Sequence, residues 1–257
     1  MSPPAGEIRL YAAQDEKPMK FMIGKAKMEG LATANKKATI HIVTLSAWIA
    51  LASLFTEYMK WWPNPERGIL GYLRPLPAFA CTLVPLIALI DWFNRPQFED
   101  LAQETLKGPD IPDMLAHYGR SPASGLFVLE FDGNPVGIAA VDASLDAETK
   151  TVAPPNKTRA RGTSETAVLR HFYVDEPYRT VNIQNDLLQH ALRHTFTAKS
   201  PPQRVKAVCS SLTNYLEHCL KEEGFTLQGA EGSLGIFGWK TGIWVLERER
   251  FQKKQVS

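Results

Sequence analysis

The sequence predicts a mixed α/β domain preceded by a pair of membrane-spanning helices. Two long runs without formal charge lie between residues 38 and 93. After residue 95 the hydropathy becomes ordinary, and short apolar runs typical of strands alternate with helical patterns. Within this part, Asp132-Gly133 separates two apolar runs, which is the turn chemistry of a tight β-hairpin. These observations assign residues 38–93 to a membrane hairpin and residues 95–250 to one α/β domain.

The first charge-free run covers residues 38–56, between a pair of lysines and Glu57. It has 19 residues, and at about 1.5 Å per residue this is just long enough to cross a bilayer core of about 30 Å. Trp61 and Trp62 follow it, where aromatic side chains favour the boundary between membrane and water. The sequence therefore predicts a membrane helix here.

The second charge-free run covers residues 75–90 and has only 16 residues. It becomes long enough to span the membrane when residues 68–72 join it and the Arg74 side chain extends to the surface. Its prolines would bend the helix, which membrane helices tolerate better than helices in water. An alternative stays open, in which both runs are buried core helices of a soluble domain.

Lysine and arginine are distributed unevenly around the two runs. Seven lie in residues 1–37, whereas three lie in the connection at residues 57–74. Cationic flanks favour the cytoplasmic side. Residues 1–37 are therefore predicted to be a basic cytosolic leader, and two crossings return the α/β domain to the same side. Asn156, in the only glycosylation sequon, is then expected to stay unmodified.

The remaining composition excludes several classes of protein. A net charge of +2 predicts no nucleic-acid partner. Three cysteines form neither a disulfide framework nor a zinc motif, and the six histidines lack paired metal spacing, so no metal is expected. The mean hydropathy of −0.19 is an average over an apolar hairpin and a polar domain.

The elements of the α/β domain follow from local patterns. Helices are predicted over residues 98–106, 111–118, 179–196 and 212–223, the last closed by Gly224. Strands are predicted over residues 126–131, 135–141, 167–174 and 205–209, and residues 237–248 form one or two more. Residues 143–165 are predicted to be a polar loop insertion and residues 251–257 a tail.

Two segments resemble a known family. Residues 169–192 (LRHFYVDEPYRTVNIQNDLLQHAL) resemble the central strand, acetyl-CoA loop and following helix of the GCN5-related N-acetyltransferase (GNAT) superfamily. Residues 209–225 (CSSLTNYLEHCLKEEGF) resemble its fifth strand, the next helix and a closing Gly-Phe. The resemblance implies a GNAT-like acyl-CoA N-acyltransferase fold, with a mixed central sheet that splits between its fourth and fifth strands. Two membrane helices before such a domain are similar to camello-type acetyltransferases, which implies the endoplasmic reticulum membrane with a cytosolic domain.

The same resemblance implies acetyl-CoA as the co-substrate, its pyrophosphate held by backbone N–H groups at a helix N-terminus. The family's loop has Gln or Arg, two residues, Gly, one residue, and Gly or Ala, which here fall on Arg179, Asn182 and Gln184. The arginine is kept, but both small residues are replaced. Asparagine adopts positive φ more readily than most residues, whereas a glutamine side chain can project toward the pyrophosphate. The implied cofactor-binding residues are Phe172, Tyr173, Val174, Arg179, Thr180, Val181, Asn182, Ile183 and Gln184.

Candidate catalytic residues lie in the same two segments. In many family members a tyrosine five residues before the closing Phe protonates the leaving thiolate, and that position here is Leu220. Tyr215 is the candidate replacement on the same helix, with His218 and Cys219 as alternatives. His171 is the candidate base for an incoming ammonium, because histidine titrates near neutral pH. The alternative for each is a packing or surface role.

The sequence favours a membrane-anchored, acetyl-CoA-dependent N-acetyltransferase that acts on an amine. The retained strand, Arg179 and helix support this hypothesis. The alternative is a catalytically inactive GNAT-fold module, serving as a chaperone or as a packaging or binding factor for another membrane protein. The departures at Asn182, Gln184 and Leu220 favour that alternative. The expected partners are the lipid bilayer and either an amine substrate or a membrane-protein client.

Overall fold

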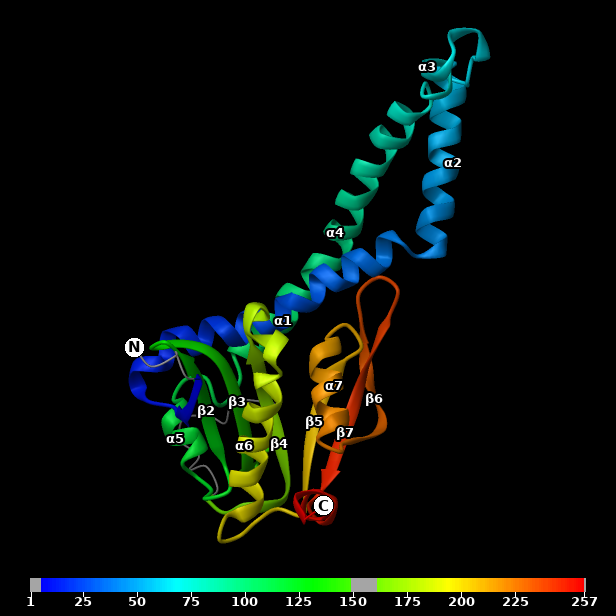
Figure 1. The fold of residues 1–257 in the computed structure, drawn as a ribbon. Helices are drawn as coiled ribbons and strands as arrows, with labels where there is room; N and C mark the ends of the chain where they lie inside the picture. Colours follow the sequence, from blue (N-terminus) through cyan, green and yellow to red (C-terminus); the bar gives the residue numbers. More distant parts are fainter. Residues whose placement is uncertain (1–5, 149–160, 257) are drawn as a thin grey trace.

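The computed structural model describes residues 6–148 and 161–256 as a seven-stranded sheet with helices on both faces and a helical hairpin that projects from one end (Figure 1). The strands are β1 (Gly6–Leu10), β2 (Gly125–Phe131), β3 (Asn134–Ser144), β4 (Thr163–Val174), β5 (Arg204–Ser210), β6 (Thr226–Leu234) and β7 (Trp239–Glu247). The helices are α1 (Glu16–Thr39), α2 (Ile42–Met59), α3 (Ile69–Tyr72), α4 (Leu76–Leu106), α5 (Met114–Tyr118), α6 (Ile183–Thr197), α7 (Asn214–Glu222) and α8 (Arg248–Val256). The predicted mixed sheet flanked by helices is confirmed.

The strand order is β1-β2-β3-β4-β5-β7-β6. Among the described strands, neighbours pair antiparallel except β4 and β5, which are parallel. A parallel pair needs a crossover connection, and α6 supplies it between these two strands. The one parallel pairing therefore lies in the middle of the sheet.

The turn between β2 and β3 forms as its sequence predicts. Phe131 pairs with Asn134, so Asp132 and Gly133 make a two-residue connection. Their φ angles are 51° and 75°. Positive φ at both positions matches the right-handed twist of the two strands, and it explains the Asp-Gly dipeptide.

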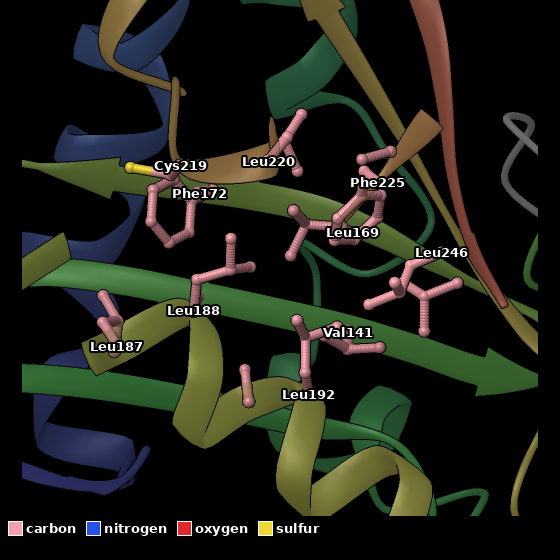
Figure 2. Close-up of a cluster of buried hydrophobic side chains, with 14 of the residues drawn as sticks. Val141, Leu169, Phe172, Leu187, Leu188, Leu192, Cys219, Leu220, Phe225 and Leu246 are labelled. Carbon is pink, nitrogen blue, oxygen red and sulfur yellow. The ribbon is translucent and has the colours of Figure 1, made fainter. Parts of the chain in front are cut away.

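Hydrophobic side chains are buried on both faces of the sheet. On one face, α6 and α7 cover the strands, and Figure 2 shows Leu188, Phe172 and Leu220 meeting there from α6, β4 and α7. On the other face, Met19 and Ile23 of α1 pack against β2 and β3 together with α5. The sheet is thus the middle layer of three.

The basic N-terminal segment belongs to the α/β domain, which corrects the prediction of a separate leader over residues 1–37. β1 pairs along β2 at one edge of the sheet, from Gly6 opposite Phe131 to Leu10 opposite Phe127. α1 then buries its apolar side chains on the sheet. The prediction failed because the positive charges were counted without their partners: Arg9, for example, donates to Asp15 at 2.6 Å.

α2 and α4 project from the domain as an antiparallel hairpin joined by α3 (Figure 1). Both α2 and the continuous stretch Ile69–Leu106 are long and apolar enough to cross a membrane, and only 17% and 11% of their most apolar windows are buried. The indole of Trp48 donates to the Phe79 carbonyl at 3.0 Å and joins the two helices. Since most of their apolar side chains face outward, the alternative of two buried core helices is wrong.

The hairpin is an insertion within the domain and not a segment that precedes it. α1 enters it from the sheet, and α4 returns as one helix of 31 residues. The helix predicted over residues 98–106 is the last part of α4, where Phe98 packs against Leu31 and Ala34 of α1. α4 therefore runs without a break from the hairpin into the domain, whereas α1 and α2 meet at a bend at residues 40 and 41.

Three other expectations differ from the structure. β6 was missed, because nearly all of its side chains are exposed and give no apolar alternation. Residues expected to form a tail belong to α8, whose Phe251 is buried in the core. The predicted loop at residues 143–165 begins with the last residues of β3 and ends with β4, while Asn156 and the rest of residues 149–160 lie outside the described residues.

Candidate active site

β4 and β5 diverge as they approach α1. They pair only over residues 166–169 and 204–207, although β4 continues to Val174 and β5 to Ser210. This is the split that the resemblance implies, and Figure 1 shows the two strands separating. Where parallel strands separate at their carboxyl ends, backbone groups on the facing edges are released for a ligand. Residues Phe172, Tyr173 and Val174 lie on this part of β4.

Two adjoining cavities lie beside the split, on the side of α1 and α4. The larger measures about 560 Å³ and the smaller about 270 Å³. Four residues line both, which makes the cavities neighbours: Lys27, Leu101, Val208 and Glu231. Small-molecule sites have this size and position in many α/β proteins.

His171 lies on β4 and lines the larger cavity. Its Nε2 is 2.6 Å from Oδ2 of Asp110, and the Tyr118 hydroxyl donates to the same oxygen at 2.8 Å. Because an ionised carboxylate only accepts hydrogen bonds, Asp110 accepts from Nε2–H of His171 whether the ring is charged or neutral, and in the neutral ring this leaves the lone pair on Nδ1. This is the arrangement in which a carboxylate orients an imidazole for proton transfer.

Asp110 is ionised despite its burial. Loss of hydration favours the neutral acid, but the hydrogen bond and charge of His171 and the hydrogen bond from Tyr118 outweigh it, and the pKa of Asp110 falls well below its ordinary value. The Asp110 side chain is 2% exposed. A buried negative charge therefore faces His171 at all pH values near neutrality.

A second buried carboxylate, Asp142, lies close to the first. His117 Nε2 and Arg170 Nε each lie 2.8 Å from its Oδ2, and the Ser144 hydroxyl donates to its Oδ1. Burial raises the pKa of Asp142, but the hydrogen bond from His117 and the charge of Arg170 lower it more, so this carboxyl is also ionised. The cluster ties α5 to β3 and β4, the strand that carries His171.

The segment between β4 and α6 forms the loop that the resemblance assigns to pyrophosphate. Residues Glu176–Val181 form a 3-10 helix, and Asn182, with φ of 58°, precedes α6. This positive φ is the conformation that the family's first glycine provides and that asparagine tolerates. The Asn182 side chain makes no capping hydrogen bond to the first turn of α6. The N–H groups of this turn, which have no partner within the helix, receive no cap from it.

Arg179 is engaged by the protein itself. Its guanidinium makes two hydrogen bonds to Glu29 of α1, at 2.5 and 2.8 Å, and its Nε donates to the Val174 carbonyl at 2.6 Å. The guanidinium carbon also lies 3.7 Å from the centre of the Tyr215 ring. Arg179 therefore joins α1, the end of β4 and α7 at the wide end of the split.

The other two departures from the family pattern are buried. The Gln184 side chain is buried, with its Nε2 3.4 Å from Asn182 Oδ1, and its Oε1 has no hydrogen-bond partner among the described residues. Leu220 lies in the hydrophobic core between α7 and the sheet (Figure 2) and has no access to either cavity.

Tyr215 is the α7 candidate that reaches a cavity. It lines the smaller one, while His218 is exposed and Cys219 is buried in the core. Burial, and then the negative charge of Glu29, raise the pKa of Tyr215 above its ordinary value, so the hydroxyl keeps its proton. His171 and Tyr215 do not line the same cavity: His171 lines the larger one and Tyr215 the smaller one beside it.

Three site residues went unrecognised in the sequence. Glu29 and Asp110 are separated from their partners by 150 and 61 positions, so no local spacing connects them. Asp142 carried a usable signal, because an acid directly after the apolar run at residues 135–141 is an unusual strand residue. Within the described part of the chain, no group of three or more His, Cys, Asp and Glu side chains is arranged to hold a metal.

No family model and no curated protein matches the chain. Solved structures with a similar course of the chain include an acetyltransferase of the GNAT family from Streptococcus pneumoniae, with 10% identity, 95% of this chain and 99% of that chain covered, and a TM-score of 0.47. Aminoglycoside acetyltransferase AAC(6')-Ib, crystallised with coenzyme A, is 11% identical to this chain. The match covers 98% of this chain and 99% of that chain, with a TM-score of 0.46. The putative acetyltransferase yncA from Salmonella typhimurium, whose structure contains acetyl-CoA, is 13% identical to this chain. The match covers 95% of this chain and 94% of that chain, with a TM-score of 0.43. These similarities concern the course of the chain and not its site residues.

Proposed function

We propose that the protein is a membrane-anchored N-acyltransferase that transfers an acetyl group from acetyl-CoA to an amine. The observation that carries this proposal is the pair of His171 and Asp110 in the wall of a cavity beside the divergence of β4 and β5. A carboxylate-oriented histidine supplies a base, and separated strand edges supply backbone donors. Neither feature alone distinguishes an enzyme from a binding protein, and it is their proximity that supports the enzyme in this proposal.

The residues at the split are compatible with acetyl-CoA. Asn182 makes no side-chain cap at the first turn of α6, and the Gln184 side chain is buried. In this proposal, backbone groups of residues 180–184 hold the pyrophosphate, and those of residues 172–174 hold the pantetheine arm and the thioester carbonyl. Acetyl-CoA supplies an activated acyl group with a thiolate as its leaving group.

The chain's own residues then handle position and protons. The amine enters from the larger cavity, and Nδ1 of His171 accepts a proton from the ammonium or from the attacking nitrogen. A carbon–nitrogen bond forms as the carbon–sulfur bond breaks, and the sulfur leaves with a proton. The neutral Tyr215 hydroxyl is the candidate donor to that sulfur. The acceleration comes chiefly from holding amine and thioester in line.

Binding of acetyl-CoA to the full chain in lipid nanodiscs, measured by calorimetry, tests this proposal. We expect saturable binding that weakens strongly in Arg179→Ala, because loss of the contacts to Glu29 and Val174 releases the loop. Glu29→Gln is the matched control, since it removes the charge pair but leaves the arginine. Equal loss in both variants means that Arg179 acts by positioning the loop. No detectable heat at millimolar acetyl-CoA rejects the enzyme.

In the same proposal, the α2–α4 hairpin crosses the membrane of the endoplasmic reticulum and both termini are cytosolic. The outward-facing apolar side chains of both helices support a lipid environment. We expect no glycan on Asn156 in cells, because glycosylation occurs on the lumenal side. A shift in mobility that is removed by a glycosidase would place the domain in the lumen. A sequon introduced in the α2–α3 connection is the positive control, because the proposed topology places that connection in the lumen.

A second function is favoured by a specific set of contacts. Asn185 in the first turn of α6 donates to Glu222 in the last turn of α7, and Leu220 occupies the core where the family's acid would lie. The hydrogen bond joins the start of α6 to the end of α7, and Leu220 supplies no proton donor. A catalytically inactive module that binds another membrane protein would keep the fold and lose the need for acetyl-CoA. The calorimetric measurement separates the two functions.

A further inference from the structure

The turn between β6 and β7 lies at the base of the helical hairpin. The Phe237 ring stacks on His41, the residue before α2, with ring centres 3.9 Å apart. The N–H groups of Gly235 and Ile236 donate to Gln97 and Asn94 of α4, each at 2.9 Å. Figure 1 shows the turn reaching toward the bend between α1 and α2. The turn is therefore fixed beside the start of α2 and the part of α4 that contains Asn94 and Gln97.

A buried polar cluster sets the position of this turn. Asn94 is fully buried; its Oδ1 accepts from the turn and its Nδ2 donates to Asn35 of α1 at 2.8 Å. Asn35 in turn donates to Asp91 of α4 at 2.6 Å. Side-chain amides that bond α1, α4 and the turn together leave little freedom for the domain to rotate about the hairpin.

Exposed apolar side chains gather at this level of the molecule. Ile236 is 40% exposed at the tip of the turn, although its backbone is bonded to α4. Large apolar side chains at the bend between α1 and α2 and next to Asn94 on α4 are exposed as well: Ile40, Ile42, Trp92 and Phe93. The exposed lysines of this region are Lys36 and Lys240, whereas the exposed Arg95 is paired with Asp91 at 2.7 Å. Aromatic and aliphatic tips flanked by lysine and arginine are typical of segments at a membrane surface.

We propose that the β6–β7 turn enters the interface of the lipid bilayer and that Ile236 inserts into the boundary between headgroups and acyl chains. The inference rests on the proposed membrane hairpin and goes beyond it, because it gives the domain a second, independent contact with the membrane. If α2 and α4 cross the bilayer, the hydrogen bond between Asn94 and Ile236 and the stacking of Phe237 on His41 hold the turn at the level where α2 begins. The cations beside it favour anionic lipid headgroups.

This contact bears directly on the candidate active site. Residues 231–234 of β6 line the smaller cavity and lead straight into the turn. A turn held in the membrane therefore fixes one wall of that cavity relative to the bilayer. The domain docks in one orientation instead of swinging on a tether.

Spin labels on the full chain in nanodiscs of phosphatidylcholine and phosphatidylserine test the proposal. Cys81 is exposed and is first replaced by serine, while the two other cysteines are buried. Single labels then replace Ile236, Leu54 in the middle of α2, and Leu227 at the other end of β6. Leu54 and Leu227 are both exposed apolar residues, at 69% and 58%. Depth is measured from the ratio of accessibility to oxygen and to a water-soluble nickel reagent.

We expect the label at 236 to be protected from the nickel reagent, at a depth between those of labels 54 and 227. If the label at position 236 is as accessible to the nickel reagent as the label at 227, while the label at 54 is protected, the docking is overturned and the membrane hairpin stays. If 54 is also accessible to the nickel reagent, the hairpin itself is wrong and the docking falls with it.

A second measurement leaves the tip free of a label. Ile236→Asp is expected to speed hydrogen exchange of the backbone amides at 235–238 in nanodiscs, because a carboxylate does not enter the interface. Leu227→Asp is the matched control and is expected to leave exchange in the turn unchanged. Exchange in the turn that is equally slow in wild type and Ile236→Asp overturns the docking.

Discussion

Replacing His171 with glutamine is expected to lower kcat for acetyl transfer by about 10²–10⁴-fold, the usual contribution of a general base. The reason is geometric: His171 lines the larger cavity and is oriented by Asp110 at 2.6 Å. Glutamine keeps a hydrogen bond to that carboxylate but accepts no proton. The affinity for acetyl-CoA is expected to stay within a factor of two or so, because the implied binding groups are backbone atoms elsewhere on β4 and α6.

Asp110 provides the companion measurement. Asp110→Asn is expected to lower kcat less than His171→Gln and to leave KM for the amine unchanged, since its side chain acts through His171. A merely structural effect would instead lower the amount of folded protein and change acetyl-CoA binding. Full activity in His171→Gln would mean that the histidine packs in the cavity wall and that another group is the base.

Replacing Asp142 with alanine is expected to destabilise the domain by about 3–5 kcal/mol, the usual cost of breaking a buried ion pair from one side. Asp142 has no exposed side-chain surface and accepts from His117 and Arg170 at 2.8 Å. Its removal takes away the carboxylate that accepts from the mostly buried Arg170 guanidinium at 2.8 Å. Thermal unfolding in detergent measures the loss. Glu148→Gln, at an exposed pair with Lys206, is the control and is expected to cost at most about 1 kcal/mol.

The same carboxylate predicts how stability depends on pH. The pKa of Asp142 is lower in the folded protein than in the unfolded chain, where it is about 3.9. The unfolded chain therefore binds the proton first, and the stabilisation is complete above about pH 4 and is lost as the pH falls toward the folded pKa. Asp142→Asn is expected to flatten this part of the curve. An unchanged acid dependence in that variant would assign the effect to other groups, of which Asp110 is the first to replace.

Much of the fold could be predicted because its signals are local. The β2–β3 turn is encoded by Asp132-Gly133, both of which adopt positive φ. α6 follows from an apolar stripe, and α7 ends at Gly224, whose φ is 93°. β4 was found from its run of apolar and aromatic residues. Each of these features depends on residues within a few positions of one another.

The parts that were wrong depend on distant partners. β1 has no apolar run of its own and exists as a strand because β2, distant in the sequence, pairs with it. A side-chain hydrogen bond from Arg9 to Glu130, 121 positions away, also joins the two strands. β6 is exposed along most of its length and is ordered by its pairing with β7. The number of charges in the N-terminal segment is a property of the sequence, but the packing of α1 against the sheet depends on contacts with distant strands.

The sequence by itself determined the two apolar helices and the alternation of strands and helices after residue 95, since composition, period and turn chemistry are properties of short segments. The mixed central sheet and the candidacy of His171 and Arg179 came from the resemblance of residues 169–192 and 209–225 to the GNAT superfamily. Only the tertiary structure decided what those residues touch. Folding brings Asp110 to His171 and Glu29 to Arg179, and it brings the β6–β7 turn to the base of the hairpin. The physical reason is that the position of a charged side chain depends on the oppositely charged group that it meets in the folded protein. The periodicity of one segment carries no information about a partner in a different segment.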